Sequence, residues 1–169
     1  YWLDGNHENH EQLAIDQGGC QNRLIYKPRG SINHFYNDEF QPVRAMFFGG
    51  TTTPDFYPKK QGINWWPQES ITHGQIAEAL KVEHPIEIIF SHDYPFAFPY
   101  KQYAERYGEA DQKFLDVLRQ HFKPKWWFFG HHHDFKEGET FGTRWFCCPI
   151  IESRRALIFD GSKVEIFDC

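Results

Sequence analysis

The stretch IEIIFSHDYP, residues 86–95, decides the fold class, because it joins a buried strand to a group of polar side chains. Ile86 to Phe90 is an almost uninterrupted apolar run, which is typical of a strand covered on both faces within a parallel sheet. Ser91, His92 and Asp93 follow directly. Open α/β sheets place functional side chains just beyond the carboxyl ends of their strands. We therefore expect an α/β fold with functional side chains at one edge of its sheet.

A second apolar run, Trp126 to Phe129, leads into Gly130 and three consecutive histidines. In an extended or turning segment, alternate side chains point to the same side, so His131 and His133 can face a metal while His132 turns away. The internal position excludes an affinity tag. The alternative is a trio of solvent-facing histidines without a ligand.

The block GNHE, from Gly5 to Glu8, supplies a third polar turn, after an apparent strand end at Tyr1 to Leu3. The Asn6 carboxamide oxygen is a weak neutral ligand that a metal recruits after stronger ones, and His7 beside it could act as an acid or a hydrogen-bond donor. The alternative is a structural turn with His7 on the surface.

Further elements follow from apolar periodicity and from capping residues. Helices are expected at Glu8 to Gln17, from Thr72 to about Val82, and around Ala110 to Phe122. Further strands are expected at Leu24 to Lys27, Val43 to Phe48, Thr140 to Cys147, Ala156 to Phe159 and Lys163 to Phe167, the last two forming a hairpin. Residues 51–67 are expected to form a long ordered loop.

The composition indicates one globular domain, residues 1–169, with 40% hydrophobic residues. The net charge of −5 argues against a broad basic surface, so extended nucleic acid is an unlikely partner. No apolar run approaches the roughly 18 to 20 residues that span a bilayer, so no membrane is expected. The four cysteines lack CxxC spacing, which disfavours a zinc ribbon or a redox pair and favours a reduced, cytoplasmic chain.

The order and spacing of the three polar blocks resemble the calcineurin-like metallophosphoesterase family, in a branch common in bacteria and their phages. The likeness is most specific at GNHE and at GHHH, with His92 between them in order. FFGG at residues 47–50 and INWWPQE at residues 63–69 are similar to the same branch. The resemblance covers nearly the whole chain and implies an α/β sandwich of two β-sheets flanked by helices.

The resemblance also implies a chemistry. Asn6, His92 and His131 would ligate one of two divalent metal ions (Mn, Fe or Zn), and His133 would reach the second. His7 would assist the leaving group or steady the phosphoryl oxygens. A metal-activated water would then hydrolyse a phosphoester, as in a phosphomonoesterase or protein phosphatase.

The sequence departs from the family where carboxylates are needed. The family's DxH and GDxxD motifs, which complete the dinuclear site, do not occur in it. We expect an upstream segment with the first βαβ units, or a second chain, to supply them. Two rival functions remain open: a phosphodiesterase or nuclease of the same fold, and a non-catalytic interaction module with a degenerate metal site.

Several other side chains carry weaker expectations. Trp65 and Trp66 could line the substrate site, but packing is the commoner role of paired tryptophans. Arg29 could contact phosphate, although a solvated loop arginine is the simpler interpretation. Near the metals, His132 and Asp134 could support the ligands. The remaining histidines are expected to have surface or helix roles, and they are His10, His34, His73, His84 and His121.

Overall fold

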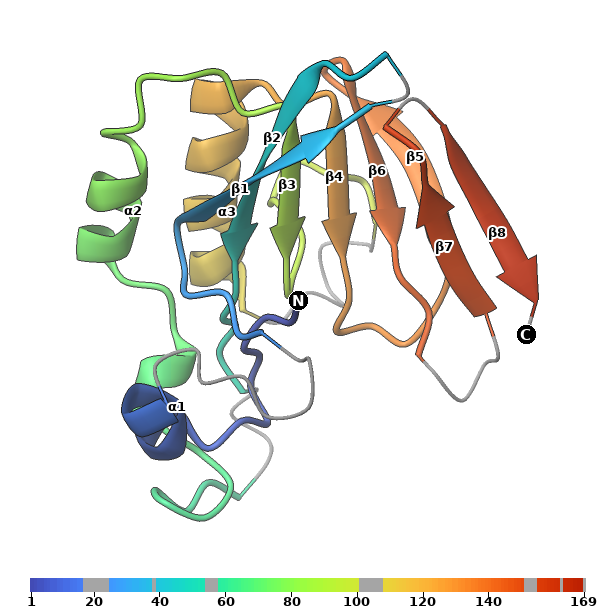
Figure 1. The fold of residues 1–169 in the computed structure, drawn as a ribbon. Helices are drawn as coiled ribbons and strands as arrows, with labels where there is room; N and C mark the ends of the chain where they lie inside the picture. Colours follow the sequence, from blue (N-terminus) through green and yellow to red (C-terminus); the bar gives the residue numbers. More distant parts are fainter. Residues whose placement is uncertain are drawn as a thin grey trace.

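The structure is a computed structural model that describes residues 1–16, 25–37, 39–53, 58–100, 108–150, 155–161 and 163–168. Its larger sheet has six strands in the order β1-β2-β3-β4-β6-β5, and a second sheet pairs β7 with β8 (Figure 1). The strands are β1 Ser31–Tyr36, β2 Pro42–Phe48, β3 Ile88–Ser91, β4 Trp126–Phe129, β5 Lys136–Thr140, β6 Thr143–Cys147, β7 Arg155–Phe159 and β8 Val164–Asp168. The helices are α1 His10–Asp16, α2 His73–Ala79 and α3 Glu109–Phe122, with a 3-10 turn at Pro67–Glu69.

The larger sheet is buried on both faces at its centre. Strands β2, β3, β4 and β6 run parallel, and β1 and β5 are antiparallel edge strands. Along β2 the side chains alternate: Met46 and Phe48 enter one core cluster, and Ala45 and Phe47 enter the other. This explains why the central strands read as continuous apolar runs instead of alternating ones.

Different layers cover the two faces. Helices α2 and α3 pack on one face through residues such as Ile76 and Leu115. On the opposite face, Leu157 and Phe159 of β7 and Val164 next to it pack against the sheet. The expected mixed α/β fold with two sheets is therefore confirmed at this level (Figure 1). Among the described residues, no helix is long and apolar enough to cross a membrane.

Several expected elements differ in the structure. The strand expected at Thr140 to Cys147 is shorter and begins at Thr143, because Phe141 and Gly142 adopt positive φ angles of 53° and 79° in the turn between β5 and β6. The strands expected at Tyr1 to Leu3 and Leu24 to Lys27 reduce to one bridge, Trp2 to Tyr26, and Leu24 lies outside the described residues. Helix α1 begins at His10 rather than Glu8, and Gln17, its expected end, lies outside the described part.

The carboxyl ends of the parallel strands lie level with one another. Phe48 pairs with Ser91, Ser91 with Phe129, and Phe129 with Cys147, so their loops leave from one edge of the sheet. Figure 1 shows the arrowheads of β2, β3, β4 and β6 at that edge, with the N-terminal segment beside them. The backbone amide of Gly50 donates to the carbonyl of Asp4 at 2.9 Å, which fixes this segment there.

The capping box of α2 gives a direct test of local stability. Thr72 Oγ1 accepts from the Gln75 amide at 3.3 Å, and Gln75 Oε1 accepts from the Thr72 amide at 3.0 Å. We expect Thr72→Ala to lower the free energy of unfolding by about 1 kcal/mol, measured by urea denaturation, because an orphan helix amide loses its acceptor. Thr72→Ser keeps the acceptor and should remain near wild type. Equal losses in the two variants would contradict this role.

Candidate functional site

Three of the predicted ligands converge at the carboxyl edge of the sheet. His92 Nε2 lies 3.1 Å from His131 Nδ1 and 3.3 Å from Asn6 Oδ1. The His92 and His131 rings are tilted, with centroids 4.9 Å apart. Asn6 is buried, and both imidazoles are partly buried. One residue of each polar block thus contributes an atom to one small cluster.

The spacing of these three atoms suits a shared cation. A single N–H on His92 Nε2 cannot donate well to both neighbours at once, whereas the three atoms each carry a lone pair that a metal can use. Ligands bound tetrahedrally at Zn–N distances of about 2.0 to 2.1 Å lie about 3.3 Å apart. No three His, Cys, Asp or Glu side chains come together as a metal site in the described ranges. The cluster is two imidazoles and an amide.

Gly5 makes room for His92. A Cβ built on Gly5 would overlap the His92 ring atoms Cε1, Nδ1 and Nε2. The glycine of GNHE is therefore required by close approach of the backbone to the imidazole. The Gly5 amide donates to the Glu8 carboxylate, and its carbonyl lies 3.0 Å from His10 Nε2, so the turn is held from both sides.

Gly5→Ala gives a test of this close approach. The added methyl group must displace the His92 ring, and a misplacement of about 1 Å at an active site can cost on the order of 100-fold in rate. For the phosphoester hydrolysis proposed below, we expect a loss of that order in kcat/KM toward an aryl phosphate. The matched control is Gly62→Ala, where a Cβ meets no atom within 4 Å, although its φ of +77° strains any replacement. Unchanged turnover by Gly5→Ala would refute the steric argument.

The turn after β4 is strained at the two histidines that the sequence predicts as ligands. His131 and His133 adopt φ angles of 66° and 57°. For residues other than glycine, this left-handed region costs about 1 to 2 kcal/mol per residue. Such strain persists where the surrounding structure fixes it and is frequent at functional sites. The Gly130 amide donates to the His92 carbonyl at 3.0 Å and ties the turn to the end of β3.

Burial sets the protonation of the ring at the centre of the cluster. Desolvation, with the neighbouring charge of His131, lowers the pKa of His92 to about 3. The imidazole is therefore neutral near pH 7, the form in which histidine binds metals. The electrostatic effect of His7 also lowers the pKa of His92, which puts His7 within electrostatic reach of His92.

The other two predicted site residues lie at the surface. The His7 side chain is exposed beside Asn6, where it can meet a substrate. His133 is also exposed, and the structure does not bring it into hydrogen-bonding contact with Asn6, His92 or His131 within the described residues. His132 points away from this cluster, as expected, and its Nε2 lies 2.9 Å from Asp93 Oδ1.

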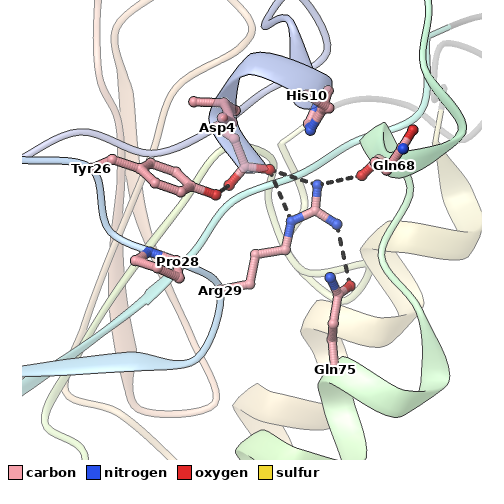
Figure 2. A pocket seen from close by; sticks show the side chains of 8 residues that line it. Asp4, His10, Tyr26, Pro28, Arg29, Gln68 and Gln75 are labelled. Atoms are coloured by element: carbon pink, nitrogen blue, oxygen red, sulfur yellow. Dashed lines mark hydrogen bonds and ion pairs between the residues drawn. The ribbon is translucent and has the colours of Figure 1, made fainter. Parts of the chain in front are cut away.

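Arg29 has a structural role that differs from both expectations for it. Its guanidinium donates to Asp4 Oδ2 from Nε at 2.9 Å and from Nη2 at 2.6 Å, and only 5% of its side chain is exposed. Nη2 also donates to the carbonyls of Gln68 and Glu69, and Nη1 donates to the carbonyl of Ser70 and the amide oxygen of Gln75. Figure 2 shows the bonds to Gln68 and Gln75. Arg29 is therefore neither solvated nor available to phosphate.

A cavity of about 540 Å³ adjoins this ion pair, and its walls include Tyr26, Pro28 and Gln68 (Figure 2). The Tyr26 hydroxyl donates to Asp4 Oδ1 at 3.1 Å. Burial and the Asp4 charge raise the pKa of Tyr26 well above its usual range. Asp4 therefore holds two donors in place immediately before the GNHE turn.

Sequence reasoning missed several buried polar residues behind the site. His10, assigned to the surface or a helix role, is buried and bonds the Gly5 carbonyl. Glu69 is fully buried, and its carboxylate accepts from the amide and hydroxyl of Thr53. Trp66 is buried, which supports packing, and Trp65 is partly exposed. The one available signal was the density of Thr, Asp and Glu in loops that flank the histidine blocks.

Comparisons with known proteins extend the fold assignment. No family model and no curated protein matches the sequence. Among solved structures, the chain is similar to the TT1561 protein of Thermus thermophilus, with a TM-score of 0.62 and 11% identity over 98% of this chain. A second structure gives a TM-score of 0.60, also with 11% identity over 98% of this chain. The chain spans 70% of the first protein and 65% of the second. At 11% identity, these structural similarities show a similar fold only.

Proposed function

We propose that the chain belongs to the calcineurin-like metallophosphoesterases and forms part of a metal-dependent phosphoester hydrolase, with phosphomonoesters as its main substrates. The observation that carries the proposal is the convergence of Asn6, His92 and His131 within 3.1 to 3.3 Å around one ring nitrogen. These residues come from three separate loops at the carboxyl edge of a parallel sheet, where α/β proteins hold their ligands.

In this proposal, Asn6, His92 and His131 hold a divalent ion, and Mn, Fe and Zn all accept imidazole. When bound, the ion supplies a Lewis acid and lowers the pKa of a coordinated water. Gly5 keeps the His92 ring close to Asn6, and Asn6 is itself buried. The fold would therefore hold the candidate ligand side chains in place even without a bound ion.

His7 and His133, whose side chains are exposed, would act at the solvent-facing side of the site. His7, exposed beside Asn6, donates a proton to the leaving oxygen or a hydrogen bond to the phosphoryl group. His133 would reach a second ion. The free thiols of Cys147 and Cys148 fit the reducing, cytoplasmic setting that we propose.

The test is hydrolysis by the full-length protein reconstituted with Mn²⁺, on an aryl phosphate, a bis-aryl phosphate and DNA. We expect cleavage of the aryl phosphate that EDTA abolishes and Mn²⁺ restores. Cleavage of the diester or of DNA alone would replace the monoesterase proposal with the phosphodiesterase or nuclease. No turnover and no metal binding would favour the non-catalytic module.

A further inference from the structure

The middle histidine of GHHH is anchored in the protein interior. Its Nε2 lies 2.9 Å from Asp93 Oδ1, and only 9% of its side chain is exposed. Its ring packs against Tyr94 and Tyr100, with centroids 5.1 and 4.8 Å away. A carboxylate accepts and does not donate, so the His132 ring is the donor. His132 therefore points away from the cluster formed by its neighbour His131.

The Asp93 carboxylate forms hydrogen bonds with several segments of the chain. Its fully buried carboxylate accepts from the Tyr94 amide at 2.8 Å, the Thr51 hydroxyl at 3.2 Å and the Gln112 amide group at 3.1 Å, besides His132. Burial alone raises the pKa of Asp93, but the His132 hydrogen bond and the nearby imidazole charges outweigh it and lower the pKa. The carboxylate therefore links the end of β3 to the loop after β2, to α3 and to the GHHH turn.

Backbone strain marks the turn that carries His131. His131 and His133 are both in the left-handed region, on either side of His132. Two backbone hydrogen bonds fix its start, from the Gly130 amide to the His92 carbonyl and from the His132 amide to the Gly130 carbonyl at 2.7 Å. The buried side chain of His132 is the anchor between the two strained residues.

We infer that Asp93 and His132 are positioning residues, which hold the strained GHHH turn so that His131 Nδ1 faces His92 Nε2. This inference rests on the proposed function for its metal, but its geometry belongs to the chain itself. Without the anchor, His131 and His133 can relax toward ordinary backbone angles, and the ring of His131 leaves the cluster. Partners of this kind, one step removed from the ligands, change metal affinity without contacting the metal.

The experiment compares Asp93→Asn, His132→Phe and His132→Gln in the full-length protein, with Co²⁺ as the probe. Phenylalanine keeps the ring and loses the donor, whereas glutamine keeps an N–H donor. We expect Asp93→Asn and His132→Phe to weaken Co²⁺ binding about 10- to 100-fold and to alter its visible absorption, and His132→Gln to recover much of the loss. His84→Gln, an exposed histidine away from the site, is the matched control and should bind as wild type.

The outcomes separate this inference from the proposed function. Lower thermal stability with wild-type Co²⁺ affinity and absorption in Asp93→Asn and His132→Phe would overturn the positioning role and leave a structural one. If the wild-type protein binds no Co²⁺, the proposed function fails, and crystal structures of metal-free wild type and His132→Phe decide the inference. His131 Nδ1 still beside His92 Nε2 in the variant would overturn it, and a displaced His131 ring would support it.

Discussion

Replacing His92 with glutamine is expected to abolish both metal binding and phosphoester hydrolysis. His92 Nε2 is the atom that the other two candidate ligands share, at 3.1 Å from His131 Nδ1 and 3.3 Å from Asn6 Oδ1. Substitutions one step removed from a metal typically cost 10- to 100-fold, so loss of a direct ligand should lower kcat/KM by more than about 100-fold. The measurements are turnover of an aryl phosphate with saturating Mn²⁺ and calorimetric titration with the ion.

Two comparisons make the His92 result specific. His84→Gln changes an exposed histidine on the loop before β3 and should leave turnover and metal binding at wild-type values. Circular dichroism of His92→Gln should match wild type, because the ring lies at the sheet edge and not within either apolar core. Wild-type turnover by a folded His92→Gln protein would remove His92 from the site and with it the proposed function.

The centre of the fold was predictable from local sequence. Trp126 to Phe129 was expected as a strand and is β4 with the same bounds, since a short run of large apolar residues that ends at a glycine is typical of a strand buried on both faces. The Thr72 capping box predicted where α2 begins. The edge strands were missed because burial does not mark them: β5, KEGET, is mostly exposed and polar, as edge strands are when they avoid aggregation.

The convergence of His92 and His131 was predictable, because residues that follow neighbouring parallel strands lie at one edge of the sheet. The resemblance alone placed Asn6 with them, since Asn6 follows an isolated bridge and not a strand of that sheet. The arrangement of His132, buried against Asp93, and His133, exposed, could not be predicted. It depends on positive φ angles at His131 and His133 and on the inward bond from His132 to Asp93. These are tertiary effects that alternation along a strand does not describe.

The contacts of Arg29 could not be predicted from the sequence either. Its sequence neighbours, a proline before it and a glycine after it, are typical of an exposed loop. Its partners, Asp4, residues 68–70 and Gln75, are distant in sequence and meet it only in the folded chain. A buried arginine of this kind can be identified only from the folded structure, which brings these segments together.

Arg29→Met is expected to be the most destabilising single substitution that we propose. It leaves the Asp4 carboxylate buried, with 2% of its side chain exposed, and removes the donors that bond the carbonyls of residues 68–70. Breaking a buried ion pair by removing one partner costs about 3 to 5 kcal/mol, because a charge remains without compensation. Urea denaturation should therefore show a midpoint well below that of wild type.

Matched variants separate the buried charge from a general effect of losing a cation. Lys81→Met breaks the Lys81–Glu78 pair, whose side chains are 69% and 72% exposed, and should change stability by less than about 1 kcal/mol. Adding Asp4→Asn to Arg29→Met removes the uncompensated carboxylate and should recover part of the loss, a coupling that a double-mutant cycle measures. If Arg29→Met unfolded at the wild-type urea concentration but raised KM for an aryl phosphate, Arg29 would be a phosphate ligand, and the structural role that its hydrogen bonds assign would be wrong.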